Sequence, residues 1–162
     1  MARREQESRA QALVNELVER IRQVSKLSEL ELSDDLIHPD NGKLSQLARE
    51  FTSDRQKREE DKLKPTQLRR TFHELKRMEQ ELRRGKSQLD RVQLGLTTAE
   101  LAYALGRGVI PKPFYDLMKA LLGKVADKED FKRLTDFLTV LLAYHKYHEK
   151  VRSSQQSEGG EE

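Results

Sequence analysis

Residues 64–85 read KPTQLRRTFHELKRMEQELRRG, and this stretch decides the fold class of the chain. Its apolar side chains recur at intervals of three and four residues, which is the spacing of one face of an α-helix. They are Leu68, Phe72, Leu75, Met78 and Leu82. Pro65 suits the first turn of a helix, and Gly85 suits its end. The stretch therefore predicts an amphipathic helix from Pro65 to about Arg84.

The same spacing continues along the chain, and no segment shows the strict alternation of a β-strand. We expect further helices over residues 9–27, from Leu44, over the segment LTTAELAYAL (96–105), from Pro113, and from Lys128 to about Val151. Their starts are predicted from capping residues. These are Ser8 with Gln11, Thr97 with Glu100, and Asp127. Gly106 and Gly108 are expected to end the helix of residues 96–105.

These elements predict an all-α fold, a compact bundle of five or six helices. A single domain is expected over residues 1–152, with residues 1–60 as its N-terminal helical part. Residues 29–42 have the composition of a loop, and the charged run of residues 53–62 is either a solvated helix end or a linker. Residues 153–162 are expected to form a disordered acidic tail.

Composition excludes several classes of function. Apolar residues make up 35% of the 162-residue chain and charged residues 36%, so each helix has a narrow apolar face and a large polar surface. The chain contains no cysteine, which excludes disulfides, thiolate metal sites and cysteine nucleophiles. No apolar run reaches the roughly 18 residues of a transmembrane helix. We therefore expect a cytoplasmic protein.

Positive charge is concentrated in one region of the chain. Residues 62–91 contain ten cations and four anions, a local net charge of +6 in a chain of formal net charge +3. On a helical wheel, seven basic residues of this region lie opposite the apolar face. They are Arg69, Arg70, His73, Lys76, Arg77, Arg83 and Arg84. We expect too few acidic partners at i+3 or i+4 to balance them.

Two interpretations of this basic face remain open. It is either an ordinary solvated helix surface or a row of cations that contacts successive phosphates of a nucleic acid without reading its bases. Aromatic side chains for base stacking are scarce, because Phe72 faces the core. Any contact with nucleic acid is therefore expected to be independent of sequence.

Three segments carry a resemblance to a known family: LKPTQLRRTFHELKRME (63–79), LAYALGRG (101–108) and FKRLTDFLTVLLAYHKY (131–147). In this order and spacing they resemble the small subunit of the Csm effector complexes of type III-A CRISPR–Cas systems. The resemblance covers residues 62–151. It implies a non-catalytic, all-helical subunit that stacks in several copies beside the repeated backbone subunit and lines the groove holding guide RNA paired to target RNA. The large subunit of the complex is a further expected partner.

The resemblance also implies particular contact residues. Those carried over from the first two segments are Lys64, Gln67, Arg69, Arg70 and Arg107. The positions of Lys76, Arg77, Arg83 and Arg84 as RNA contacts come from the helical wheel instead. No catalytic residue, metal site or cofactor is predicted.

Other motifs lead to weaker hypotheses. Gly85-Lys86-Ser87 resembles the end of a P-loop, but Gln80 stands where that motif needs its first glycine. His145 and His148 have a spacing that two metal ligands could use, although no third ligand lies nearby in the sequence. The apolar segment FLTVLLAYHKY (137–147) is either the central helix of the bundle or a subunit contact. The alternative function is a self-associating helical adaptor or scaffold that binds only protein.

Overall fold

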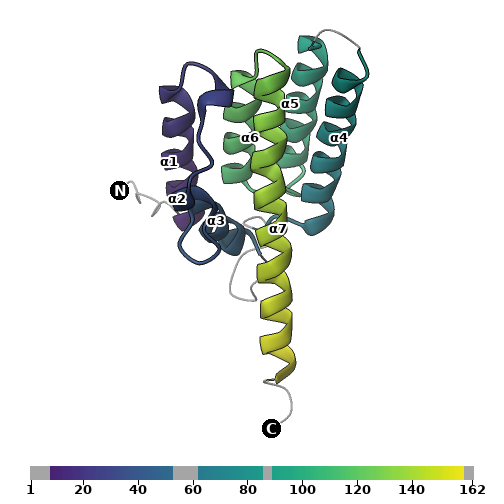
Figure 1. Cartoon of the computed structure of the whole chain (residues 1–162). Coiled ribbons are helices and arrows are strands. Elements are labelled where there is room, and N and C mark those ends of the chain that lie inside the picture. Colours follow the sequence, from purple (N-terminus) through teal and green to yellow (C-terminus); the bar gives the residue numbers. More distant parts are fainter. Residues whose placement is uncertain (1–7, 53–61, 86–88, 159–162) are drawn as a thin grey trace, which may run out of the picture.

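The computed structural model describes residues 8–52, 62–85 and 89–158. Within these ranges all the regular structure is helical (Figure 1). The α-helices are α1 (Arg9–Gln23), α2 (Asp34–Ile37), α3 (Lys43–Phe51), α4 (Pro65–Arg83), α5 (Arg91–Gly106), α6 (Lys112–Lys124) and α7 (Lys128–Glu158), with a 3₁₀ turn η1 at Leu27–Glu29. The predicted all-α bundle is confirmed. The short helix α2 lies in the segment that we expected to be a loop.

Helices α6 and α7 organise the packing. Helices α3 and α4 pack on α7, and helices α1 and α5 pack on α6. The side chains that α7 contributes to the core are fully buried. They are Phe131, Leu134, Phe137, Leu138 and Leu141. Truncating a buried phenylalanine to alanine typically costs about 3–5 kcal/mol, so this part of α7 is a main source of stability.

The N-terminal helices belong to the same hydrophobic core as the rest of the chain. Phe51 of α3 meets Phe114 of α6 edge to face, with 6.1 Å between the ring centroids. The segment after α1 is held by buried Asp130, whose carboxylate accepts hydrogen bonds from the backbone N–H groups of Ser28 and Ala126, each at 2.9 Å. Residues 8–52 therefore support the helices that follow them.

Most predicted helix ends are confirmed, although α1 ends at Gln23 and not at residue 27. The Ser8 side chain caps α1 by accepting from the N–H of Gln11. Pro65 begins α4, and Gly85 follows it with a φ of +87°, a conformation that glycine adopts at little cost.

The predicted start of α5 is wrong. The helix begins at Arg91, because the Asp90 carboxylate accepts hydrogen bonds from the N–H groups of Val92 and Gln93 and so caps an earlier turn. Thr97 consequently lies inside the helix, where its hydroxyl donates to the carbonyl of Gln93.

The predicted end of α7 is also wrong. The helix continues beyond Val151 to Glu158 and extends past the other helices (Figure 1). The Ser153 and Ser154 hydroxyls donate to carbonyls one turn earlier, so these serines are compatible with the helix. The first part of the segment expected to be a disordered tail is thus helical, and residues 159–162 lie outside the described ranges. No helix of the described residues is both long enough and apolar enough to cross a membrane.

Candidate nucleic-acid interface

Helix α4 has two distinct faces. Leu68, Leu75 and Met78 are buried on the side that packs against α7. Arg69 and Arg70 are exposed on another side, as is Lys64 at the N-cap. In the part of the chain that the structure describes, the side chains of these three cations form no ion pair, so they are available to an anionic partner.

Three other cations of the helix are already paired, contrary to our expectation that acidic partners would be too few. The Arg77 guanidinium donates hydrogen bonds to Glu74 at 2.7 Å and to Glu81 at 2.8 Å, and the bond to Glu74 is the main reason that the pKa of Arg77 is raised. Lys76 and Arg83 both lie near Glu79, at 3.7 and 3.1 Å.

Glu79 is the acidic side chain on the core side of α4. Although ionisable, it is only 6% exposed, and it accepts a hydrogen bond from the hydroxyl of fully buried Thr135 on α7. A buried carboxylate needs such partners, because desolvation is costly for a charge. Lys76 and Arg83 therefore help to neutralise Glu79, and this role competes with the phosphate contacts predicted for them.

The remaining basic residues lie in two places. Arg84 is exposed at the C-cap of α4, at the opposite end of the helix from Lys64. Arg107 is exposed at the C-cap of α5, where Gly108, with a φ of +73°, completes the turn. The predicted helix stop is confirmed there, and the Arg107 side chain is still free to reach a ligand.

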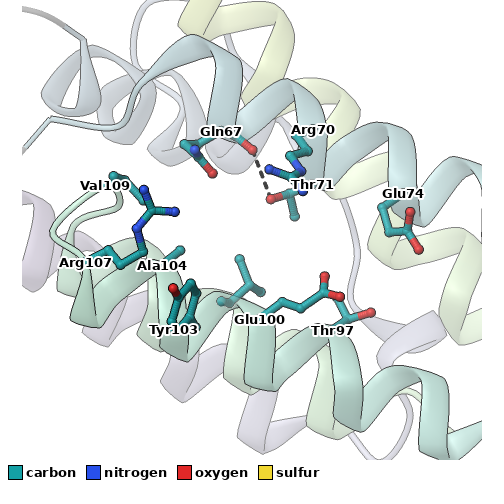
Figure 2. A pocket seen from close by; sticks show the side chains of 11 residues that line it. Gln67, Arg70, Thr71, Glu74, Thr97, Glu100, Tyr103, Ala104, Arg107 and Val109 are labelled. Carbon is teal, nitrogen blue, oxygen red and sulfur yellow. Dashed lines mark hydrogen bonds between the residues drawn. The ribbon is translucent and has the colours of Figure 1, made fainter.

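A groove of about 370 Å³ separates α4 from α5 (Figure 2). Gln67 and Arg70 line it from α4, and Arg107 lines it from the end of α5 and extends toward the opposite wall. The fold thus brings together residues of the first two resemblance segments. Lys64, Arg69 and Arg84 do not line this groove.

Tyr103 was missed by the sequence analysis. This residue is 68% exposed, and its ring lies on the α5 wall with the Arg107 guanidinium 5.7 Å from the ring centroid. The groove also has an acidic region, where Glu74 and Glu100 line the walls. The i, i+4 spacing of Tyr103 and Arg107 was visible in the sequence, but the exposure of the ring depends on how α5 packs.

The two histidines of the possible metal pair make separate hydrogen bonds. His145 is buried, and its Nε2 lies 3.1 Å from the carbonyl oxygen of Leu63. The Nε2 of His148 lies 2.9 Å from the hydroxyl of Ser45. Burial lowers the pKa of both histidines. The described residues hold no cluster of three or more side chains suited to a metal ion. Lys86 and Ser87 of the rejected P-loop lie outside the described residues.

Comparison with known proteins adds one finding. A family model described as Csm2 Type III-A matches residues 39–151. The match therefore includes α3, both walls of the groove, and α7 as far as Val151. No curated protein and no solved structure matches the chain.

Proposed function

The chain belongs to the Csm2 family, the small subunits of type III-A CRISPR–Cas complexes, and from this we propose that it lines the RNA groove of such a complex. In this proposal the subunit is non-catalytic. Base pairing between guide RNA and target RNA supplies the sequence specificity, and the protein contributes positive charge and shape. Several copies stack beside the repeated backbone subunit and contact the large subunit.

The observation that carries the proposal is the convergence of Arg70 and Arg107 on one groove. They lie on different helices, and neither has an acidic partner among the described residues. Arg69 adds a third such cation on the exposed face of α4. Guanidinium groups bind phosphate oxygens through two parallel hydrogen bonds, and these contacts carry no sequence information. This arrangement suits an RNA backbone better than a small substrate.

Arg77, Lys76 and Arg83 have a secondary role in the proposal. Each would have to leave or share a carboxylate of its own helix before it could bind phosphate. We therefore assign the main phosphate contacts to Arg69, Arg70 and Arg107. Lys64 and Arg84 lie at the two ends of the exposed basic surface of α4.

The test is charge reversal in the complex assembled in cells. The tagged chain is purified at low salt, bound RNA is sequenced, and the affinity of the complex for target RNA is measured over a series of salt concentrations. Arg69→Glu/Arg70→Glu is expected to weaken target binding and to make the salt dependence shallower. The slope should change by about 0.7–0.9 for each phosphate that the protein no longer neutralises. Lys76 is left unchanged, because a carboxylate there would stand beside buried Glu79.

A matched control is Arg22→Glu/Lys119→Glu, which changes the net charge equally. Both residues are exposed and line a different depression, between α1 and α6. If both double variants bind target RNA like the wild type, the α4 surface is not a phosphate contact.

A second candidate function is an adaptor that binds only protein. It is favoured by the outward face of α5, where Val92 is 70% exposed and Leu96 53% exposed. Large apolar side chains that are exposed side by side can mark a surface that a protein partner covers. Under this alternative, other subunits would still copurify after nuclease treatment, and Arg69→Glu/Arg70→Glu would leave the affinity for target RNA unchanged.

A further inference from the structure

We infer that the groove between α4 and α5 holds one unstacked nucleotide of a bound RNA, with its base on the ring of Tyr103 and its phosphate at Arg70 and Arg107. The inference rests on the proposed RNA contact and adds a base-stacking site to it. Phosphate contacts alone would not require an aromatic side chain at this position.

The environment of Tyr103 supports a stacking site. Tyr103 is 68% exposed, so its burial contributes little to the stability of the folded state. Its hydroxyl makes no hydrogen bond with the residues that the structure describes. The Arg107 guanidinium lies 5.7 Å from the ring centroid, within the distance of a cation–π contact. Arg107 can therefore approach a phosphate while it remains next to a ring that stacks on the attached base.

The chemistry of the groove orients the nucleotide. Arg70 and Arg107 attract phosphate, whereas the carboxylates of Glu74 and Glu100 repel it. The phosphate is consequently confined to the arginines, and the base lies along the α5 wall. Tyr103 stands on that wall between Glu100 and Arg107 (Figure 2). A volume of about 370 Å³ falls within the range of roughly 300–1,000 Å³ typical of sites for small organic ligands.

A site of this kind distinguishes unstacked bases from paired ones. Every base presents an aromatic face, so stacking on Tyr103 tolerates all sequences. A base inside an intact duplex is already stacked on both sides and cannot enter the groove. The site should therefore favour single-stranded RNA, or a base displaced from the duplex, over continuous double-stranded RNA.

The test uses the full chain and two fluorescent RNA probes, a 12-nucleotide oligoadenylate and a continuous 12-base-pair RNA duplex. Binding is followed by fluorescence anisotropy over a series of salt concentrations. Tyr103→Ala should weaken binding of the single strand by about 5- to 150-fold, the range expected for removal of one base–aromatic stack. The salt dependence of single-strand binding should be the same for Tyr103→Ala as for the wild type, and so should the affinity for the duplex. The arginines that bind phosphate are all still present in this variant.

Two further variants make the result specific. Tyr103→Phe keeps the ring and should bind the single strand within about twofold of the wild type. Tyr147→Ala removes another exposed tyrosine, 54% exposed on α7, and should bind like the wild type. Tyr103→Phe behaving like Tyr103→Ala would overturn the inference, because the hydroxyl rather than the ring would then bind RNA.

The outcomes separate the inference from the proposed function. If Arg69→Glu/Arg70→Glu weakens single-strand binding but Tyr103→Ala does not, the stacking site is refuted and the phosphate contact stands. If neither variant changes the affinity, the proposed RNA contact fails as well. A wild-type chain that binds neither probe also overturns the inference, and Tyr103 then belongs to a protein contact together with Val92 and Leu96.

Discussion

Replacing Thr135 by valine tests the buried contact that fixes α4 on α7. The substitution keeps the shape of the side chain and removes the hydroxyl that donates to Glu79. Thr135 is fully buried and Glu79 is 6% exposed, so water cannot readily replace the missing donor. The Thr135 hydroxyl also lies 2.9 Å from the carbonyl oxygen of Lys132, but it has one proton, and the charged carboxylate is the stronger acceptor.

The expected destabilisation follows from the charge of the acceptor. A hydrogen bond to a charged group contributes about 1.5–3 kcal/mol, and leaving a buried charged group short of a partner costs a similar amount or more. For a chain of this size, 1 kcal/mol corresponds to about 2–4 °C in melting temperature. Thr135→Val should therefore lower the melting temperature by about 3–12 °C, measured by circular dichroism at 222 nm and checked by urea unfolding.

Thr139→Val is the matched control, one turn further along α7. Thr139 is exposed, and its hydroxyl donates to the carbonyl of Thr135 in its own helix. Its replacement should change the free energy of unfolding by less than about 0.5 kcal/mol. A double-mutant cycle with Glu79→Gln should show that the effect of Thr135→Val depends on the carboxylate. Equal melting temperatures for Thr135→Val and Thr139→Val would refute the reasoning.

Three further predictions concern stability. Gly42→Ala should destabilise the fold by about 1–3 kcal/mol in urea unfolding, since the added Cβ would lie 2.5 Å from backbone atoms of His38. An unchanged free energy of unfolding would contradict the close packing of this turn. Gly95→Ala should instead stabilise α5 by up to about 1 kcal/mol in the same assay, because the position is helical and an added Cβ meets no atom within 4 Å. A decrease in stability would contradict the open space around this position. The free energy of unfolding should fall as the pH is lowered below about 6.5, because burial lowers the pKa of His145 and His148 and the unfolded chain then binds more protons than the native one. In His145→Gln, the free energy of unfolding should depend less on pH between 7.5 and 5.5. A slope equal to that of the wild type would show that His145 does not cause the dependence.

The sequence predicted the helices best where their ends depend on local chemistry. Ser8, Pro65 and Gly85 act within a turn of the backbone groups that they affect, so their effects are visible in the sequence. Helix α5 was predicted to begin too late because both Asp90 and Thr97 are good N-caps. The competition between two such caps is decided by how the intervening turns pack.

The sequence indicated which residue types the candidate site contains, but not which of its charged side chains form ion pairs. The resemblance singled out Gln67, Arg70 and Arg107, and the structure places all three on one groove. The hydrogen-bond partner of Glu79 could not be foreseen, because Thr135 lies 56 residues away on another helix. Exposure of Tyr103 likewise depends on the packing of α5 and not on its neighbours in the chain.

The two walls of the groove pack on different helices of the core. Helix α4 packs mainly on α7, and α5 packs mainly on α6. A ligand that touches both walls therefore links two parts that are otherwise joined largely through the core. A ligand that binds only the folded chain raises the free energy of unfolding, by about 2.7 kcal/mol at a concentration 100 times its Kd. A natural ligand retained during purification would accordingly raise the melting temperature of the preparation, and disappearance of that increase after ribonuclease treatment would identify the ligand as RNA.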